Sequence, residues 1–140
     1  MNDIWQKIVS EIRLYASDEP ALKSFFARSI LDHYSLDQAL ASILAKLLVE
    51  SSVSTESLKS IFMEAFDSAP EIVEATRIDL HAVLERDSAC NELHLPFLYF
   101  KGFHALQIHR VSNWLWNENR KSLALYLQNR TSCVCGVDIH

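Results

Sequence analysis

Apolar residues recur at helical spacing along the first 86 residues of the chain. Residues 2–15 place Ile4, Ile8 and Ile12 on one face of a helix. Four later stretches repeat the period with the apolar stripes Leu22, Phe25, Phe26 and Ile30; Leu36, Leu40, Ile43, Leu44, Leu47 and Leu48; Leu58, Ile61, Phe62, Ala65 and Phe66; and Ile72, Thr76, Leu80 and Val83. The pattern predicts five amphipathic helices in this part of the chain.

Short polar segments indicate where these helices begin. Asp18-Glu19-Pro20 offers an N-cap acid followed by a proline in the first turn, where its missing N–H costs nothing. Ser35 to Gln38 fits a capping box, in which the hydroxyl and the amide each satisfy a backbone donor. Ser68 to Glu71 predicts a second capping box, opening a helix that runs to about Arg86. The polar run Glu50 to Ser54 predicts a loop.

The second half of the chain has a different pattern. Residues 87–94 lack periodicity and predict a loop, whereas residues 96–116 are apolar nearly all round. A helix of this kind must be covered on every side, by its own domain or by another subunit. Gly102 marks either a break between a short and a long helix or the close approach of another backbone. Residues 117–119 can end this element, and Leu123 and Leu127 belong to a last helix.

Helices joined by short links predict an all-α fold, an antiparallel multi-helix bundle over residues 1–135. The closing tetrapeptide, Val137-Asp138-Ile139-His140, alternates apolar and polar residues and resembles the start of a strand. We therefore expect residues 136–140 to begin a different unit.

Composition supports a single globular domain and narrows its partners. The 140 residues are 49% hydrophobic and 22% charged, which excludes a disordered chain. The net charge of −5 argues against nucleic acid or an anionic membrane as a partner. A basic stretch containing Arg110, Arg120 and Lys121 indicates solvated helix positions, with a nucleic-acid-binding face as the alternative.

No apolar run approaches the ~20 residues that span a bilayer. Residues 1–5 show no signal-peptide pattern, so we expect no membrane association. The three cysteines, Cys90, Cys133 and Cys135, are an odd number without framework spacing, which favours the reducing cytoplasm.

Local sequence alone identifies few residues as candidates for catalysis or for ligand or metal binding. Two glycines are too few for a phosphate-binding loop, and Glu92 and His94 would need partners from elsewhere to hold a metal, so we expect no metal site. His104 lies in an apolar helix and is expected to be a core or interface histidine with one nitrogen satisfied. Arg86 and Asp87 would form a surface ion pair.

Several strings carry a family resemblance. They are PFLYFKGFHALQ at 96–107, WLWN at 114–117, LQN at 127–129 and VDIH at 137–140, with weaker matches at Trp5, Glu19-Pro20, residues 65–71 and Arg86-Asp87. In order and spacing they resemble the N-terminal domain of bacterial serine O-acetyltransferases over essentially the whole chain.

The resemblance implies an enzyme that transfers acetyl from acetyl-coenzyme A (acetyl-CoA) to L-serine, giving O-acetylserine for cysteine biosynthesis. In this family the helical domain precedes a left-handed parallel β-helix of hexapeptide repeats, which would begin at residues 136–140 and bind the thioester. The helical domain itself is expected to bind no cofactor. Family members form homo-oligomers, as dimers of trimers, with L-cysteine as feedback inhibitor and a C-terminal tail for O-acetylserine sulfhydrylase.

The resemblance also assigns residues. Asp87 matches the aspartate that recognises the amino acid, with Arg86 as a second substrate-binding candidate, and Ser88 stands where the family usually has proline. Asp138 matches the catalytic aspartate that orients a histidine beyond residue 140. The alternative is a non-enzymatic helical oligomerisation or protein-interaction module of shared ancestry that ends at His140. Hexapeptide repeats after His140 would exclude this alternative.

Overall fold

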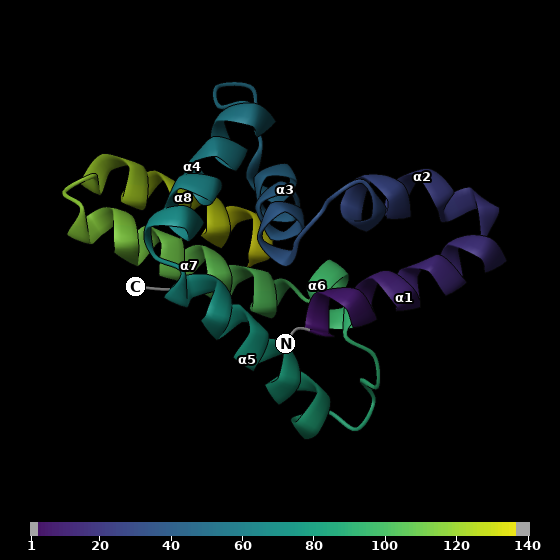
Figure 1. The fold of residues 1–140 in the computed structure, drawn as a ribbon. Coiled ribbons are helices and arrows are strands. Elements are labelled where there is room, and N and C mark those ends of the chain that lie inside the picture. Colours follow the sequence, from purple (N-terminus) through teal and green to yellow (C-terminus); the bar gives the residue numbers. More distant parts are fainter. Residues whose placement is uncertain (1–2, 137–140) are drawn as a thin grey trace.

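The computed structural model describes residues 3–136, which fold as helices joined by short links (Figure 1). The elements are α1 (Asp3–Asp18), the 3-10 turn η1 (Pro20–Leu22), α2 (Lys23–Phe26), the π-helical turn η2 (Ala27–Leu31), α3 (Leu36–Leu48), α4 (Thr55–Ser68), α5 (Glu71–Arg86), α6 (His94–Tyr99), α7 (Lys101–Asn117) and α8 (Lys121–Cys135). Among these residues the extended pairing is limited to one bridge between Glu50 and Val53. The predicted all-α fold is confirmed.

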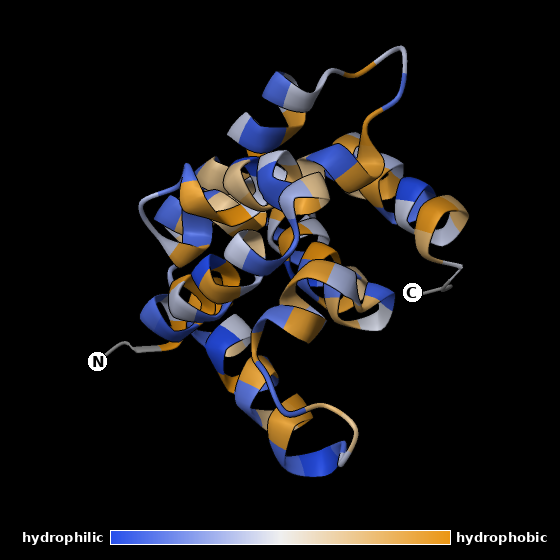
Figure 2. Cartoon of the chain, turned by 90° about the vertical axis from the view of Figure 1, so that its right-hand side faces the viewer, coloured by the Kyte–Doolittle hydropathy of each residue, from blue (hydrophilic) through white to orange (hydrophobic). Residues whose placement is uncertain are grey.

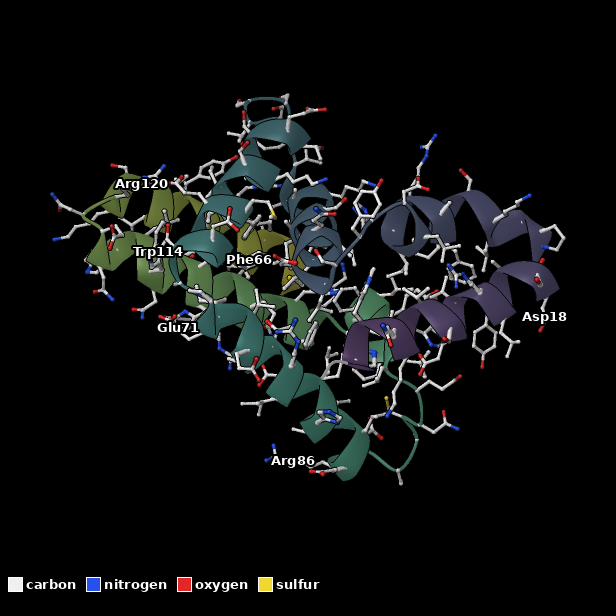
Figure 3. All side chains as sticks on the ribbon, viewed as in Figure 1. Asp18, Phe66, Glu71, Arg86, Trp114 and Arg120 are labelled. Atoms are coloured by element: carbon white, nitrogen blue, oxygen red, sulfur yellow. The ribbon has the colours of Figure 1, made fainter. Side chains whose placement is uncertain are left out.

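Two helical hairpins form the larger part of the bundle. α3 and α4 pack along each other, as do α7 and α8, and each pair is joined by a tight connection (Figure 1). α5 lies against α7, and α1 lies against the short α6 and the η2 turn. Figure 3 shows Glu71 and Arg86 at opposite ends of α5, with the Arg86 end away from the hairpins. This end of α5 therefore sits at the periphery of the molecule.

The apolar stripes meet in one core. The largest fully buried side chains are Phe62, Phe97, Ile8, Ile12, Ile30, Leu36, Leu40, Leu44, Leu48, Leu58, Leu80 and Leu93. Apolar and polar residues alternate around the helices in Figure 2, as helices with one buried face require. The core supplies the main driving force for folding, because each buried Leu, Ile or Phe side chain contributes about 1.5–3 kcal/mol.

Residues 20–31 depart from the single α-helix that their spacing predicts. The chain passes through a 3-10 turn, one α-helical turn and a π-helical turn, in which the Asp32 N–H bonds to the Ala27 carbonyl five residues back. Because the helical pitch changes within this segment, the side chains of the predicted apolar stripe do not all face the core. Phe26 and Ile30 are buried, whereas Leu22 and Phe25 are exposed, so half of the predicted stripe is wrong.

Of the three predicted start signals, the one at Ser35 is confirmed. The Ser35 hydroxyl accepts a hydrogen bond from the Gln38 N–H at 3.4 Å, and the Gln38 amide oxygen accepts one from the Tyr34 N–H. The signal at residues 18–20 is confirmed for Pro20, which lies in the first turn of η1, but the predicted N-cap is wrong. α1 continues through Asp18, and Glu19 takes the N-cap position without a side-chain hydrogen bond.

The capping box at residues 68–71 is also wrong. Ser68 is the last residue of α4, and Pro70 occupies the position before α5. Only two residues separate the helices, so the hydroxyl of Ser68 belongs to the preceding helix and leaves the first N–H groups of α5 uncapped by a side chain.

The long apolar stretch divides into α6 and α7. The break lies at Phe100, with φ −88° and ψ 107°, and Gly102 follows in the first turn of α7. A Cβ at Gly102 would have no atom from another part of the described chain within 4 Å, so the alternative of a close backbone approach is wrong here. Tyr99, Leu106 and Trp116 stay exposed, and this chain therefore covers the stretch only in part.

His104 joins the two pieces of this stretch. Its Nε2 lies 2.7 Å from the Phe97 carbonyl oxygen and therefore carries the hydrogen, and its Nδ1 has no hydrogen-bond partner within residues 3–136. This is the core histidine with one satisfied nitrogen that the sequence predicts. Burial lowers the pKa of His104, because a second N–H on the ring would be buried without an acceptor.

A polar network joins α5 to α7. The Gln107 side chain is fully buried; its oxygen lies 2.8 Å from the Thr76 hydroxyl and its nitrogen donates to Asp79 Oδ2 at 2.8 Å. Arg110 donates to the Gln107 oxygen at 2.8 Å and forms an ion pair with Asp79 at 2.5 Å. Since these groups satisfy one another, the network fixes α5 along α7 at little desolvation cost.

No helix within residues 3–136 combines the length and the apolar character needed to cross a bilayer.

We expect the stability of the fold to decrease in mild acid because of His104. The unfolded chain binds a proton at His104 below about pH 6.5, whereas the folded chain resists it, so unfolding free energy falls by up to about 1.4 kcal/mol per pH unit. Urea unfolding between pH 7.5 and 5.5 measures this loss. His104→Gln keeps a donor for Phe97 and should show a smaller loss; His33, whose pKa burial also lowers, remains in both proteins. An equal loss in both proteins would contradict the assignment.

We expect Arg110→Lys to destabilise the protein by about 1–3 kcal/mol, because an ammonium cannot replace the guanidinium fork that binds Asp79 and Gln107. The matched control is Arg77→Lys, in the exposed pair with Glu74 at 3.4 Å, which should change stability by less than about 0.5 kcal/mol. Chemical denaturation of both variants gives the comparison. Equal changes in unfolding free energy for the two variants would mean that the Arg110 network does not stabilise the packing of α5 on α7.

Candidate functional site

Asp87 follows the last residue of α5 and is exposed. Its backbone N–H bonds to the Val83 carbonyl, which continues the helical pattern by one residue. Its Oδ1 accepts the Ala89 N–H at 3.0 Å, and its carbonyl accepts the Cys90 N–H at 3.0 Å. Within the described chain, Oδ2 accepts no hydrogen bond. The turn thus holds the carboxylate in place and leaves one of its oxygens available to a ligand.

An open cleft of about 870 Å³ borders this carboxylate. It lies between the last turns of α5 and the start of α7. Val83, Phe103 and Leu106 give it apolar walls, and the charged side chains on it include Arg86, Asp87 and Lys101. Both signs of charge therefore border one cleft, which suits a small molecule that itself carries both signs.

Arg86 lines the cleft beside Asp87, but the two do not form the predicted surface ion pair. Arg86 is exposed and makes no ion pair with any residue of the described range. Figure 3 shows Arg86 at the peripheral end of α5. Its guanidinium is therefore free of protein partners within residues 3–136.

One charge on the wall of the cleft, the Lys101 ammonium, acts on the thiol of Cys135 at the end of α8. Burial raises the pKa of the Cys135 thiol, and the Lys101 ammonium counteracts this rise. Lys101 lines the cleft, and Cys135 ends α8. Asp138, the predicted catalytic aspartate, and the strand-like tetrapeptide at 137–140 lie outside the described residues.

A second polar cluster forms behind the loop that follows Asp87. Ligand atoms of Glu11, Glu92 and His94 lie within 4.8 Å of one another, and Tyr15 donates a 2.5 Å hydrogen bond to Glu92. That hydrogen bond is the largest cause of the raised pKa of Tyr15. Glu11 is the third residue that Glu92 and His94 would need from elsewhere in the chain to form a cluster. Glu11 could not be identified from sequence, because it lies 83 residues before His94 on a different helix.

Arg110, Arg120 and Lys121, the three basic residues of the stretch considered for nucleic-acid binding, are engaged within the bundle. Arg110 is paired with Asp79, and Arg120 donates to Glu64 at 3.0 Å. The Lys121 ammonium lies 4.9 Å from the centre of the Trp116 ring. These contacts disfavour the alternative of a nucleic-acid-binding face, since each cation already has a protein partner.

Comparison with known proteins identifies the family. A sequence profile described as the N-terminal domain of serine acetyltransferase matches residues 4–108. The serine acetyltransferase of Haemophilus influenzae is 46% identical over 138 residues, which are 99% of this chain and 52% of that protein.

Solved structures agree. A serine acetyltransferase of Neisseria gonorrhoeae in complex with serine is 44% identical with a TM-score of 0.96, and covers 100% of this chain and 58% of its own. A serine acetyltransferase in complex with cysteine is 47% identical, with a TM-score of 0.96. The matched region is 100% of this chain and 58% of the chain in that structure. The chain spans about half the length of the relatives that it matches. From the profile, the identities and the shared fold, the chain belongs to the serine acetyltransferase family.

Proposed function

We propose that this chain is the amino-acid-recognising helical half of an enzyme that transfers an acetyl group from acetyl-CoA to L-serine. The observation that carries the proposal is the Asp87 carboxylate, exposed beside an open cleft with one oxygen unoccupied by the described residues. An interior position for this side chain would have ruled the role out.

Asp87 would bind the ammonium group of L-serine. A charge-assisted hydrogen bond of this kind contributes about 1.5–3 kcal/mol and has a defined direction. Arg86, exposed on the same cleft, would attract the carboxylate of the amino acid. With both charged groups of serine held, its hydroxyl is oriented, and orientation of this kind can contribute several kcal/mol to catalysis.

The reaction itself would need residues after the helical domain. A histidine beyond residue 140, oriented by Asp138, would remove the proton of the serine hydroxyl. The hydroxyl oxygen then attacks the thioester carbonyl carbon, the carbon–sulfur bond breaks, and coenzyme A leaves as O-acetylserine forms. A solved serine acetyltransferase in complex with coenzyme A supports acetyl-CoA as the acetyl donor. We infer that residues 136–140 begin the β-helix that binds it.

Family relationship also suggests the partners. The relative solved with cysteine supports L-cysteine as a feedback inhibitor of the same site. We expect a homo-oligomer, a dimer of trimers, and the exposed Tyr99, Leu106 and Trp116 are available for contacts between subunits. O-acetylserine sulfhydrylase would bind a C-terminal tail. The three unpaired cysteines fit a cytoplasmic location.

We expect Asp87→Asn, made in the full-length product of the gene, to raise the KM for L-serine by about 10-fold to 100-fold, because a neutral amide loses the charge that holds the ammonium. The KM for acetyl-CoA should change little. Steady-state kinetics with each substrate varied in turn gives both values. Asp138→Asn should instead lower kcat.

Glu85→Gln is the matched control for Asp87→Asn. It removes one negative charge from the exposed end of α5, two residues away, without touching the cleft. Its serine kinetics should stay at the wild-type level. Unchanged serine kinetics in Asp87→Asn would refute the role of Asp87, and a full-length product unable to acetylate serine would favour the non-enzymatic helical module.

A further inference from the structure

A side chain from α1 holds the far end of the loop that begins at Asp87. Glu11 Oε2 accepts the Leu93 N–H at 3.1 Å, and Oε1 accepts the His94 N–H at 2.9 Å. The His94 Nδ1 lies 2.8 Å from the same Oε1. Because a carboxylate only accepts hydrogen bonds, Nδ1 must carry a hydrogen. One carboxylate therefore binds three N–H groups at the start of α6.

Tyr15 adds a second contact from the same face of α1. It lies one helical turn after Glu11 and donates to Glu92 Oε1 at 2.5 Å. Its ring lies 5.1 Å from the His94 ring. Glu11 and Tyr15 thus hold three consecutive residues, 92 to 94, and we call this arrangement the Glu11 clamp.

The near end of the loop is exposed and is held by hydrogen bonds within its own turn. Ser88 and Ala89 are exposed, and the Asp87 carboxylate is fixed mainly by the bond from the Ala89 N–H. The next inward anchor is Cys90, 4% exposed, whose N–H bonds to the Asp87 carbonyl. Holding both ends of a short exposed loop reduces the number of conformations open to the residues between them. α5 anchors the end of the loop at Asp87, and the Glu11 clamp anchors the other end at residues 92–94.

We propose that Glu11 is a positioning residue for Asp87. By fixing residues 92–94 against α1, it limits the conformations of the loop 87–93 and keeps the Asp87 carboxylate on the cleft. The proposal rests on the function proposed above for Asp87, and it assigns Glu11 an effect on serine binding without contact with serine.

The hydrogen bonds of the cluster favour a clamp over a metal site. Glu11, Glu92 and His94 are close enough to share a divalent cation. A cation on Nδ1 would have to displace its hydrogen and break the 2.8 Å contact with Glu11. Both Glu11 oxygens are also already bonded to N–H groups.

The test compares Glu11→Ala, Glu11→Gln and Tyr15→Phe with the wild type in the full-length gene product. We expect Glu11→Ala to raise the serine KM by about 5-fold to 20-fold with kcat and the acetyl-CoA KM within about 2-fold, because loss of order acts on substrate positioning. Glu11→Gln keeps an acceptor oxygen and should recover part of the loss. Glu85→Gln, which removes an exposed charge without a hydrogen bond, should match the wild type.

Hydrogen exchange gives an independent readout of the clamp. Mass spectrometry of peptides covering residues 88–95 should show faster exchange in Glu11→Ala, and a smaller change in Tyr15→Phe, which removes one hydrogen bond and leaves the core intact. If Glu11→Ala fails to fold, Glu11→Gln and Tyr15→Phe carry both measurements. A full-length wild-type protein that does not acetylate serine would refute the proposed function. The hydrogen-exchange rates of residues 88–95 would still show whether Glu11 holds the loop.

Three outcomes would overturn the proposal. The first is unchanged exchange in the loop, and the second is faster exchange with an unaltered serine KM, which would leave Glu11 a purely structural role. The third is a zinc-dependent rise in melting temperature that His94→Ala abolishes, because the cluster would then be a metal site.

Discussion

The Gln107 side chain lies between α5 and α7, without contact with water, and bonds to both helices. It is hydrogen-bonded to Thr76 and Asp79 on α5, and Arg110 on its own helix completes the group. A buried amide is stabilising only when its donors and acceptors are satisfied, so the two helices have one favourable alignment. That alignment brings the end of α5 beside the start of α7, and the cleft with Asp87 is a direct result.

The helical scaffold was predictable because burial of one face imposes a period that sequence displays. Ile8, Leu44 and Phe62 lie in the core as their spacing predicts. The errors lie where a local signal competes with the neighbouring helix. Asp18 and Ser68 are good N-cap residues, but the preceding helices extend through them. The changes of helical type within residues 20–31 have no sequence signature either, and Leu22 and Phe25 of this segment are exposed.

The candidate site was predictable only in part. Asp87 was assigned by family resemblance, and its own neighbours in sequence indicated nothing more than an ion pair. Lys101 gave no signal, since only the fold brings the start of α7 beside the end of α5. Glu11 is the clearest case: two of its three partners are backbone N–H groups 82 and 83 residues away, and backbone groups have no residue identity that a sequence can reveal.

Gly102 affects both the stability of α7 and the space in the cleft. It lies in the first turn of α7 on the wall of the cleft, and nothing from elsewhere in residues 3–136 fills the space over its Cα. A methyl group there would favour the helix by up to about 1 kcal/mol. The same methyl group, and any larger one, would add atoms to the wall of the cleft that Asp87 borders. At Gly102, helix stability and open space in the cleft thus favour different residues, as in many proteins whose binding sites lower stability.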